Sequence, residues 1–73
     1  MSVSILEALY NAEMNVSTAQ KVPAMTRILL PLANEQLHNA ITLLEKGYGL
    51  DDEVDPLLEE YGNVDDVPLK VES

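Results

Sequence analysis

The segment between Pro23 and Gly47 constrains the fold most, because its apolar side chains repeat every three or four residues. Proline suits the first turn of a helix, and glycine readily adopts the left-handed conformation that ends one. We therefore predict a helix from about residue 23 to Lys46. Pro31 lies inside this segment and has no backbone N–H, so it should kink or split the helix nearby.

An earlier helix is predicted over about residues 4–19. Ser4 and Glu7 have the spacing of a capping box, in which each residue satisfies a free backbone N–H of the other. Leu9 shares one side of this helix with Ile5, Ala12 and Val16. Pro23 then disfavours a helical conformation at Val22. Residues 1–50 are thus expected to form an antiparallel helical hairpin.

The second predicted helix has two apolar faces. On a helical wheel of about 100° per residue, Leu37 is the centre of one face, and we expect that face to pack on the first helix. Its other members are Leu30, Ala33, Ile41 and Leu44. The second face contains Met25, Leu32 and Leu43, and Leu29 lies between the two faces. A hairpin covers only one face, so the other is covered either by a third helix or by another subunit or partner.

A short third helix is predicted at about residues 56–61. Asp55 is suited to the N-cap, Pro56 to the first turn and Gly62 to the C-terminal cap. Its apolar face contains Leu57, Leu58 and Tyr61. Beyond Gly62 the period changes to two, with Val67, Leu69 and Val71 alternating with other residues, which indicates an extended C-terminal arm.

The charge is concentrated at the C-terminal end. Residues 51–73 carry 1 − 9 = −8, whereas residues 1–50 carry 3 − 4 = −1. The acidic segment can keep the chain dispersed, dock on a basic partner, or mimic the phosphates of nucleic acid. The alternating apolar residues of the arm favour docking, for instance on the edge of a sheet. A net charge of −9 argues against direct binding to nucleic acid or to an anionic membrane.

The small size of the chain predicts association. A chain of 73 residues builds a marginal core, and it has no cysteine for a disulfide and one histidine. The N-terminal residues lack the basic flank and apolar core of a secretory signal, and the longest apolar stretch is too short to span a bilayer. We expect no membrane association and a location in the cytoplasm or within a virion.

Three groups of residues were weighed as chemical sites. Glu35 and His38 have the Glu-x-x-His spacing of di-metal bundles, but the wheel places both away from the apolar face centred on Leu37. A calcium loop that starts at Asp51 would need glycine and glutamate where Pro56 and Gly62 stand. Glu13 lies near the apolar face of the first helix. One alternative is that it lies at the rim of that face, where its carboxylate is either in water or paired with Lys21 or Arg27. The other is that it is a carboxylate of an interface or a site. We predict no metal, no cofactor and no enzymatic activity.

Together these patterns predict an all-α fold with a hairpin, a kinked second helix, a short third helix and an acidic arm. The predicted function is a small structural or assembly protein that forms homo-oligomers or docks on a protein partner, such as an accessory or head protein of a bacterial virus or a small adaptor subunit. The alternatives are an acidic inhibitor that mimics nucleic acid and, more distantly, a di-metal helical bundle. The expected interface residues are Met25, Leu29, Leu32, Leu43, Leu57, Leu58, Tyr61, Val67, Leu69 and Val71.

Overall fold

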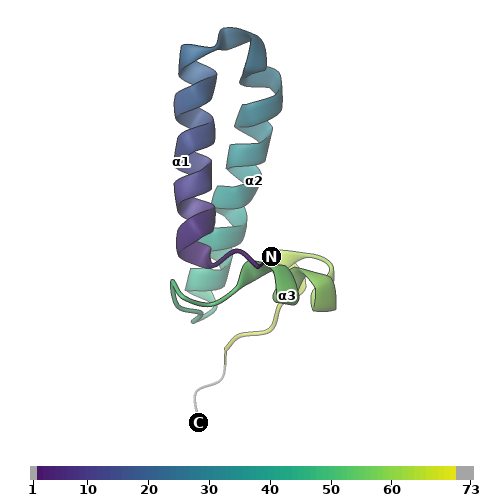
Figure 1. Ribbon diagram of the computed structural model, residues 1–73. Coiled ribbons are helices and arrows are strands. Elements are labelled where there is room, and N and C mark those ends of the chain that lie inside the picture. The colour runs from purple at the N-terminus through teal and green to yellow at the C-terminus, as the bar shows by residue number, and fades with distance from the viewer. Residues whose placement is uncertain (1, 71–73) are drawn as a thin grey trace.

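The computed structural model describes residues 2–70, which form three α-helices and no strand. The helices are α1 (Ile5–Lys21), α2 (Thr26–Glu45) and α3 (Val54–Tyr61), and two short 3-10 turns are η1 (Pro23–Met25) and η2 (Val64–Asp66). α1 and α2 lie side by side and run in opposite directions, and the short α3 crosses near their open end (Figure 1). The all-α prediction is confirmed.

The start of α1 and the ends of α2 and α3 lie at predicted capping residues. α2 begins at Thr26 and not at Pro23, because residues 23–25 form η1. Ser4 Oγ accepts a hydrogen bond from the Glu7 backbone N–H at 3.1 Å, so the Ser4 half of the predicted capping box is formed. The Glu7 carboxylate accepts from the Ser4 hydroxyl at 3.3 Å instead of from the Ser4 backbone N–H. Gly47 and Gly62 both have positive φ values, 98° and 80°, as their places after α2 and α3 require. Asp55 is not the cap of α3, because the helix begins one residue earlier, at Val54. The carboxylate of Asp55 accepts from the Val3 backbone N–H instead, at 3.2 Å.

The prediction of which α2 face meets α1 is wrong for Leu30, Ile41 and Leu44, although Ala33 of that face is buried as expected. The buried residues of α2 are Leu29, Ala33, Ala40 and Leu43. By contrast, Leu30, Ile41 and Leu44 are 42%, 49% and 37% exposed. The contact face is rotated by roughly 75° from the one centred on Leu37.

Alanines explain this rotation. Ala8, Ala12 and Ala19 are buried on α1, and Ala33 and Ala40 are buried on α2. Small side chains let two helices approach closely, and the large leucines then lie beside the contact rather than in it. α2 is one helix through Pro31, and the kink expected there stays a prediction.

The main core lies at the open end of the hairpin. Leu43 is fully buried there among residues from every helix and from η2: Ile5, Ala8, Ala40, Val54, Val64 and Val67. Leu43 was expected on the second face of α2, which the hairpin alone does not cover. The chain's own α3 and η2 cover it, which is the first of the two alternatives given above.

The last described residues are fastened to this core. Val67 is 1% exposed, the Lys70 backbone N–H donates to the Lys46 carbonyl at 2.8 Å, and the Tyr48 hydroxyl donates to the Pro68 carbonyl at 3.1 Å. Gly47 lies directly beneath, where an added Cβ would be 3.6 Å from the Cβ of Lys70. The predicted arm is therefore packed on the fold as far as residue 70, and Val71 lies outside the described residues.

Candidate interaction surface

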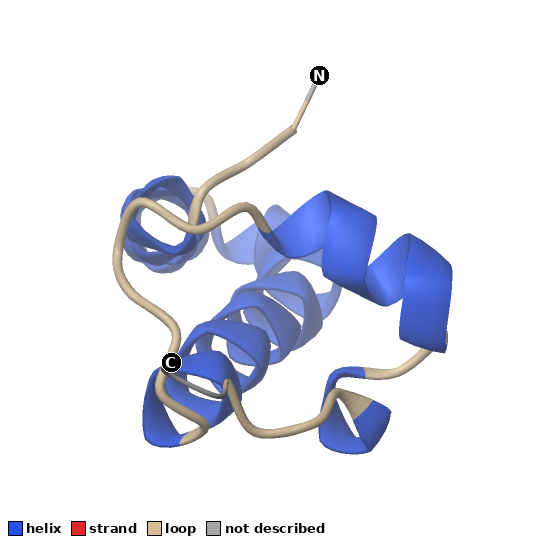
Figure 2. Ribbon diagram, turned by 90° about the horizontal axis from the view of Figure 1, so that it is seen from below, coloured by secondary structure: helices blue, strands red, loops and turns tan. Residues whose placement is uncertain are grey.

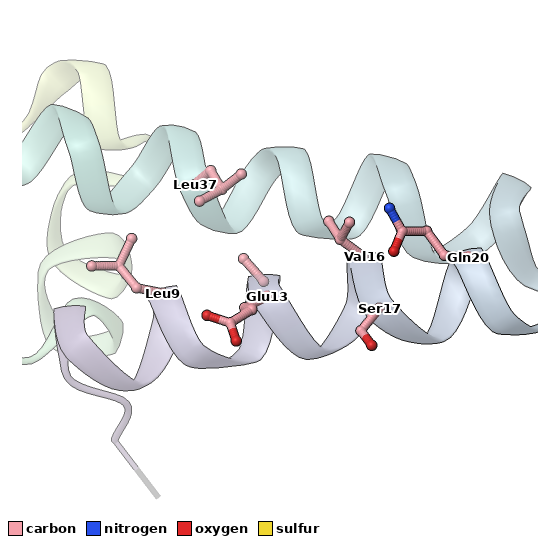
Figure 3. A pocket seen from close by; sticks show the side chains of 7 residues that line it. Leu9, Glu13, Val16, Ser17, Gln20 and Leu37 are labelled. Atoms are coloured by element: carbon pink, nitrogen blue, oxygen red, sulfur yellow. The ribbon is translucent and has the colours of Figure 1, made fainter.

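A shallow groove of about 460 Å³ runs between α1 and α2 on one face of the hairpin. Leu9 and Val16 of α1 and Leu37 of α2 point toward one another across it (Figure 3). The remaining lining residues are Ala12, Glu13, Ser17 and Gln20. The groove exists because the alanine contact below it is narrow, so the larger side chains stand at its edges.

An apolar stripe continues this groove along α2. We use the name apolar stripe for Leu30, Leu37, Ile41 and Leu44, which are three, four or seven residues apart and so share one side of the helix. Leu37 is half-buried and the other three are exposed. Exposed leucines are ordinary when scattered singly, but a contiguous row of them marks an interaction surface.

The opposite face of the hairpin is polar and partly covered. Asn15 Nδ2 donates to Gln36 Oε1 at 2.9 Å across the two helices on that side. Asn11 and Asn39 lie there too, in a smaller pocket that α3 closes with Val54 and Leu58. Seen from below, α3 and η2 lie to one side of the α1–α2 pair (Figure 2). The chain therefore uses α3 to cover the polar side and leaves the apolar stripe open.

Glu13 is exposed at the edge of the groove, as the rim interpretation predicts. Within residues 2–70 it forms no ion pair with Lys21 or Arg27. Its carboxylate thus stays hydrated beside Leu9 and Leu37, and it would meet any molecule that occupies the groove.

The ten residues predicted for an interface fall into four groups. Leu29, Leu43 and Val67 are buried in the chain's own core, and Leu57 and Leu58 are half-buried against it. Leu29 and the other two buried residues cannot touch a partner in this conformation. The exposed members are Met25, Leu32, Tyr61 and Leu69, and Val71 lies outside the described residues. Sequence reasoning missed the apolar stripe as a surface, although the regular spacing of the alanines was a signal that could have revealed it.

The residues weighed as metal ligands have other contacts. His38 Nε2 lies 3.2 Å from Asp65 Oδ1, and the Asp52 carboxylate accepts from the Gly49 backbone N–H at 2.6 Å and from Lys70 Nζ at 2.9 Å. The Gly49 hydrogen bond, followed by Lys70, lowers the pKa of Asp52 below its ordinary value. Among residues 2–70, no three His, Cys, Asp or Glu side chains lie close enough together to hold a metal ion.

Comparisons with protein-family models, with curated proteins and with solved structures find no match to this chain. In the described part of the chain, none of the helices combines the length and the apolar character that a membrane span requires.

Proposed function

We propose that this chain is a small, non-enzymatic assembly protein that associates through the face of the hairpin containing the apolar stripe. The partner is either another copy of the chain or a larger complex, as in an accessory protein of a virus particle or a small adaptor subunit. The observation that carries the proposal is the exposed row of Leu30, Ile41 and Leu44 beside an open groove.

The composition of the core supports association. Of the eleven apolar residues that are buried within residues 2–70, five are alanines, which gain little free energy on burial. Several of the largest apolar side chains remain outside, among them Ile28 and Ile41. A chain of this size has little stability to spare, so covering those side chains with a partner is an available source of it.

A second candidate function is an acidic inhibitor that mimics nucleic acid. The observation in its favour is the charge of residues 45–70, which is 2 − 9 = −7. In the sequence, the alternation of Val67, Leu69 and Val71 favours docking, because a pure charge mimic needs no apolar residues. In the structure, Val64 and Val67 belong to the chain's own core, so Val67 no longer favours docking over mimicry. A partner bound through this end would be basic, and its affinity would fall steeply with salt.

A photo-crosslinking amino acid at residue 41 tests the proposed surface in cells that naturally contain the protein. We expect an adduct from position 41, and we expect that adduct to disappear when Leu37→Asp is added. The control position is Met14 on the outer side of α1, which is more accessible, at 65% exposure against 49% for Ile41. Equal adducts from both positions, or an adduct that Leu37→Asp does not affect, would count against the surface.

A further inference from the structure

We propose that the molecule covering the apolar stripe is a second copy of this chain, which runs antiparallel to the first about a two-fold axis near Leu37. This inference rests on the proposed function and specifies its partner. It is carried by two independent patterns along the hairpin, the spacing of the leucines and the distribution of the charges.

The leucines of the stripe are symmetric about Leu37. Leu30 and Leu44 each lie seven residues away from it, which is two helical turns, or about 10.5 Å along the axis. A two-fold interface brings the same patch of both copies together. With a two-fold axis at Leu37, Leu37 packs against Leu37 of the second copy. Leu30 of each copy packs against Leu44 of the other, which gives two equivalent contacts.

The charges favour the antiparallel orientation. Residues 14–34, at the turn end of the hairpin, carry 2 − 0 = +2, and residues 45–70, at the open end, carry 2 − 9 = −7. The ends are about 30 Å apart along α2, whereas charges are screened over about 8 Å at physiological salt, so each end acts separately. A parallel pair would place −7 beside −7. An antiparallel pair places +2 beside −7 at both ends.

Arg27 and Glu45 give this complementarity a specific contact. They are 18 residues apart, which is five full turns, so both lie on the same side of α2, at the edge of the stripe. Both are exposed, and within residues 2–70 neither forms an ion pair. They lie about 15 Å and 12 Å from the level of Leu37, on opposite sides of it. In the antiparallel dimer, Arg27 therefore lies close to Glu45 of the second copy.

Sedimentation equilibrium measures the dimer directly. We expect the chain to sediment as a dimer of twice 8.0 kDa, or 16.0 kDa, at micromolar concentrations. Ile41→Asp should give a folded monomer, because Ile41 is 49% exposed and contributes little to the core. Ile28→Asp is the matched control: the same change is made on α2 at a side chain that is 67% exposed and lies off the stripe, and it should leave the dimer intact.

A charge swap tests the register. Arg27→Glu and Glu45→Arg should each raise the dissociation constant roughly three- to tenfold, and the double variant should restore it to within about twofold of the wild type. Lys21→Glu and Glu59→Arg make the same changes of net charge away from the stripe and should have smaller effects that do not compensate. A dimer in which the double variant is no better than the single ones would overturn the antiparallel register.

Distances between spin labels give the orientation independently, since the chain has no native cysteine. Cysteine at Ala24, in the turn, should give a label separation of roughly 40 Å in the antiparallel dimer and under roughly 20 Å in a parallel one. Cysteine at Met14 lies near the proposed axis level and should give a short distance. A short distance from Ala24 would overturn the orientation.

The outcomes separate this inference from the proposed function. If the chain stays monomeric at every concentration but position 41 still crosslinks another protein, the inference that the partner is a second copy is wrong. The proposed surface is then still supported. Loss of both the dimer and the position 41 adduct would overturn both.

Discussion

Lys46 Nζ donates a hydrogen bond to the backbone carbonyl of Val67, twenty-one residues further along the chain. The same ammonium group donates to the Asp65 carbonyl at 2.9 Å, and the Lys46 carbonyl accepts from the Lys70 backbone N–H at 2.8 Å. Lys46 is the C-cap residue of α2, so these bonds fix the C-terminal segment to the end of that helix. The segment that reads in the sequence as a free arm is a structural part of the fold.

Replacing Lys46 with methionine should destabilise the chain. The change keeps most of the apolar stem but leaves the carbonyls of Asp65 and Val67 without their charged donor, so we expect the free energy of unfolding to fall by about 1–2 kcal/mol. Urea denaturation monitored by circular dichroism measures it. Lys21→Met, in the exposed last turn of α1, is the matched control and should change the free energy by less than about 0.5 kcal/mol. Equal effects of the two variants would show that the Lys46 contacts contribute nothing.

Val67 and Leu69 should respond oppositely to truncation, although both were predicted to contact a partner. Val67→Ala removes two methyl groups from a site that is 1% exposed, so we expect a loss of about 2 kcal/mol of stability. Leu69 is 69% exposed, and Leu69→Ala should cost less than about 0.5 kcal/mol. The free energies from urea unfolding of the two variants provide the check, and a larger cost at Leu69 would contradict the packing described for this segment.

Local signals in the sequence were sufficient for the start of α1 and for the ends of α2 and α3. The capping pair of Ser4 and Glu7 and the glycines at positions 47 and 62 act through their own neighbours, so their roles do not depend on the rest of the fold. The α-helical class follows from the same signals together with the apolar period. Asp55 was misassigned because a carboxylate that suits an N-cap can equally accept from a distant backbone N–H, here that of Val3.

The size of the apolar side chains did not predict which face of α2 packs on α1. Leu37 is the centre of the bulkiest face, but the helices meet where Ala33 and Ala40 allow close approach. The alternation of apolar residues near the C-terminus was ambiguous in the same way. It predicts that Val67 is covered, but it does not distinguish coverage by the chain's own core from coverage by another protein. Both errors concern which surface covers an apolar residue, and that is decided by tertiary packing.

The adjacent residues Leu43 and Leu44 should separate folding from association. Leu43 is fully buried, so Leu43→Ala should lower the free energy of unfolding by about 2–5 kcal/mol. Leu44 is 37% exposed on the stripe, so Leu44→Ala should have a much smaller effect on folding at low protein concentration and weaken the dimer instead. Urea unfolding below the dimer dissociation constant, with sedimentation above it, distinguishes the two. Strong destabilisation of the monomer by Leu44→Ala would contradict its placement on the surface.

The stability contributed by Asp52 should disappear in acid. Its pKa is lowered in the folded chain, so its contribution is complete above the unfolded value of about 3.9 and is lost as the pH falls through the folded value. We expect the melting temperature of Asp52→Asn to lie below that of the wild type at neutral pH, and the gap to close as the pH falls below about 4. Asp51→Asn, which removes an exposed carboxylate that accepts neither of those two hydrogen bonds, controls for the loss of one charge. A gap that persisted unchanged at low pH would show that the Gly49 and Lys70 contacts do not stabilise the ionised form.

Glu13 provides the most selective test of the proposed dimer axis. It lines the same groove as Leu37, so an axis at Leu37 brings the two Glu13 carboxylates of an antiparallel dimer near each other. Glu13→Gln keeps the shape and removes this repulsion, so we expect the dissociation constant to fall roughly three- to tenfold, since two like charges several ångströms apart in water repel by about 1 kcal/mol.

The control is Glu35→Gln, which makes the same change in net charge at an exposed residue beside His38 and η2, away from the groove. It should tighten the dimer much less, because it acts only through the total charge. The advantage of Glu13→Gln should also shrink as salt is added, because screening already weakens the repulsion in the wild type. Sedimentation of the three proteins at two salt concentrations decides the matter. If Glu13→Gln tightens the dimer no more than Glu35→Gln does, the axis does not pass near Leu37.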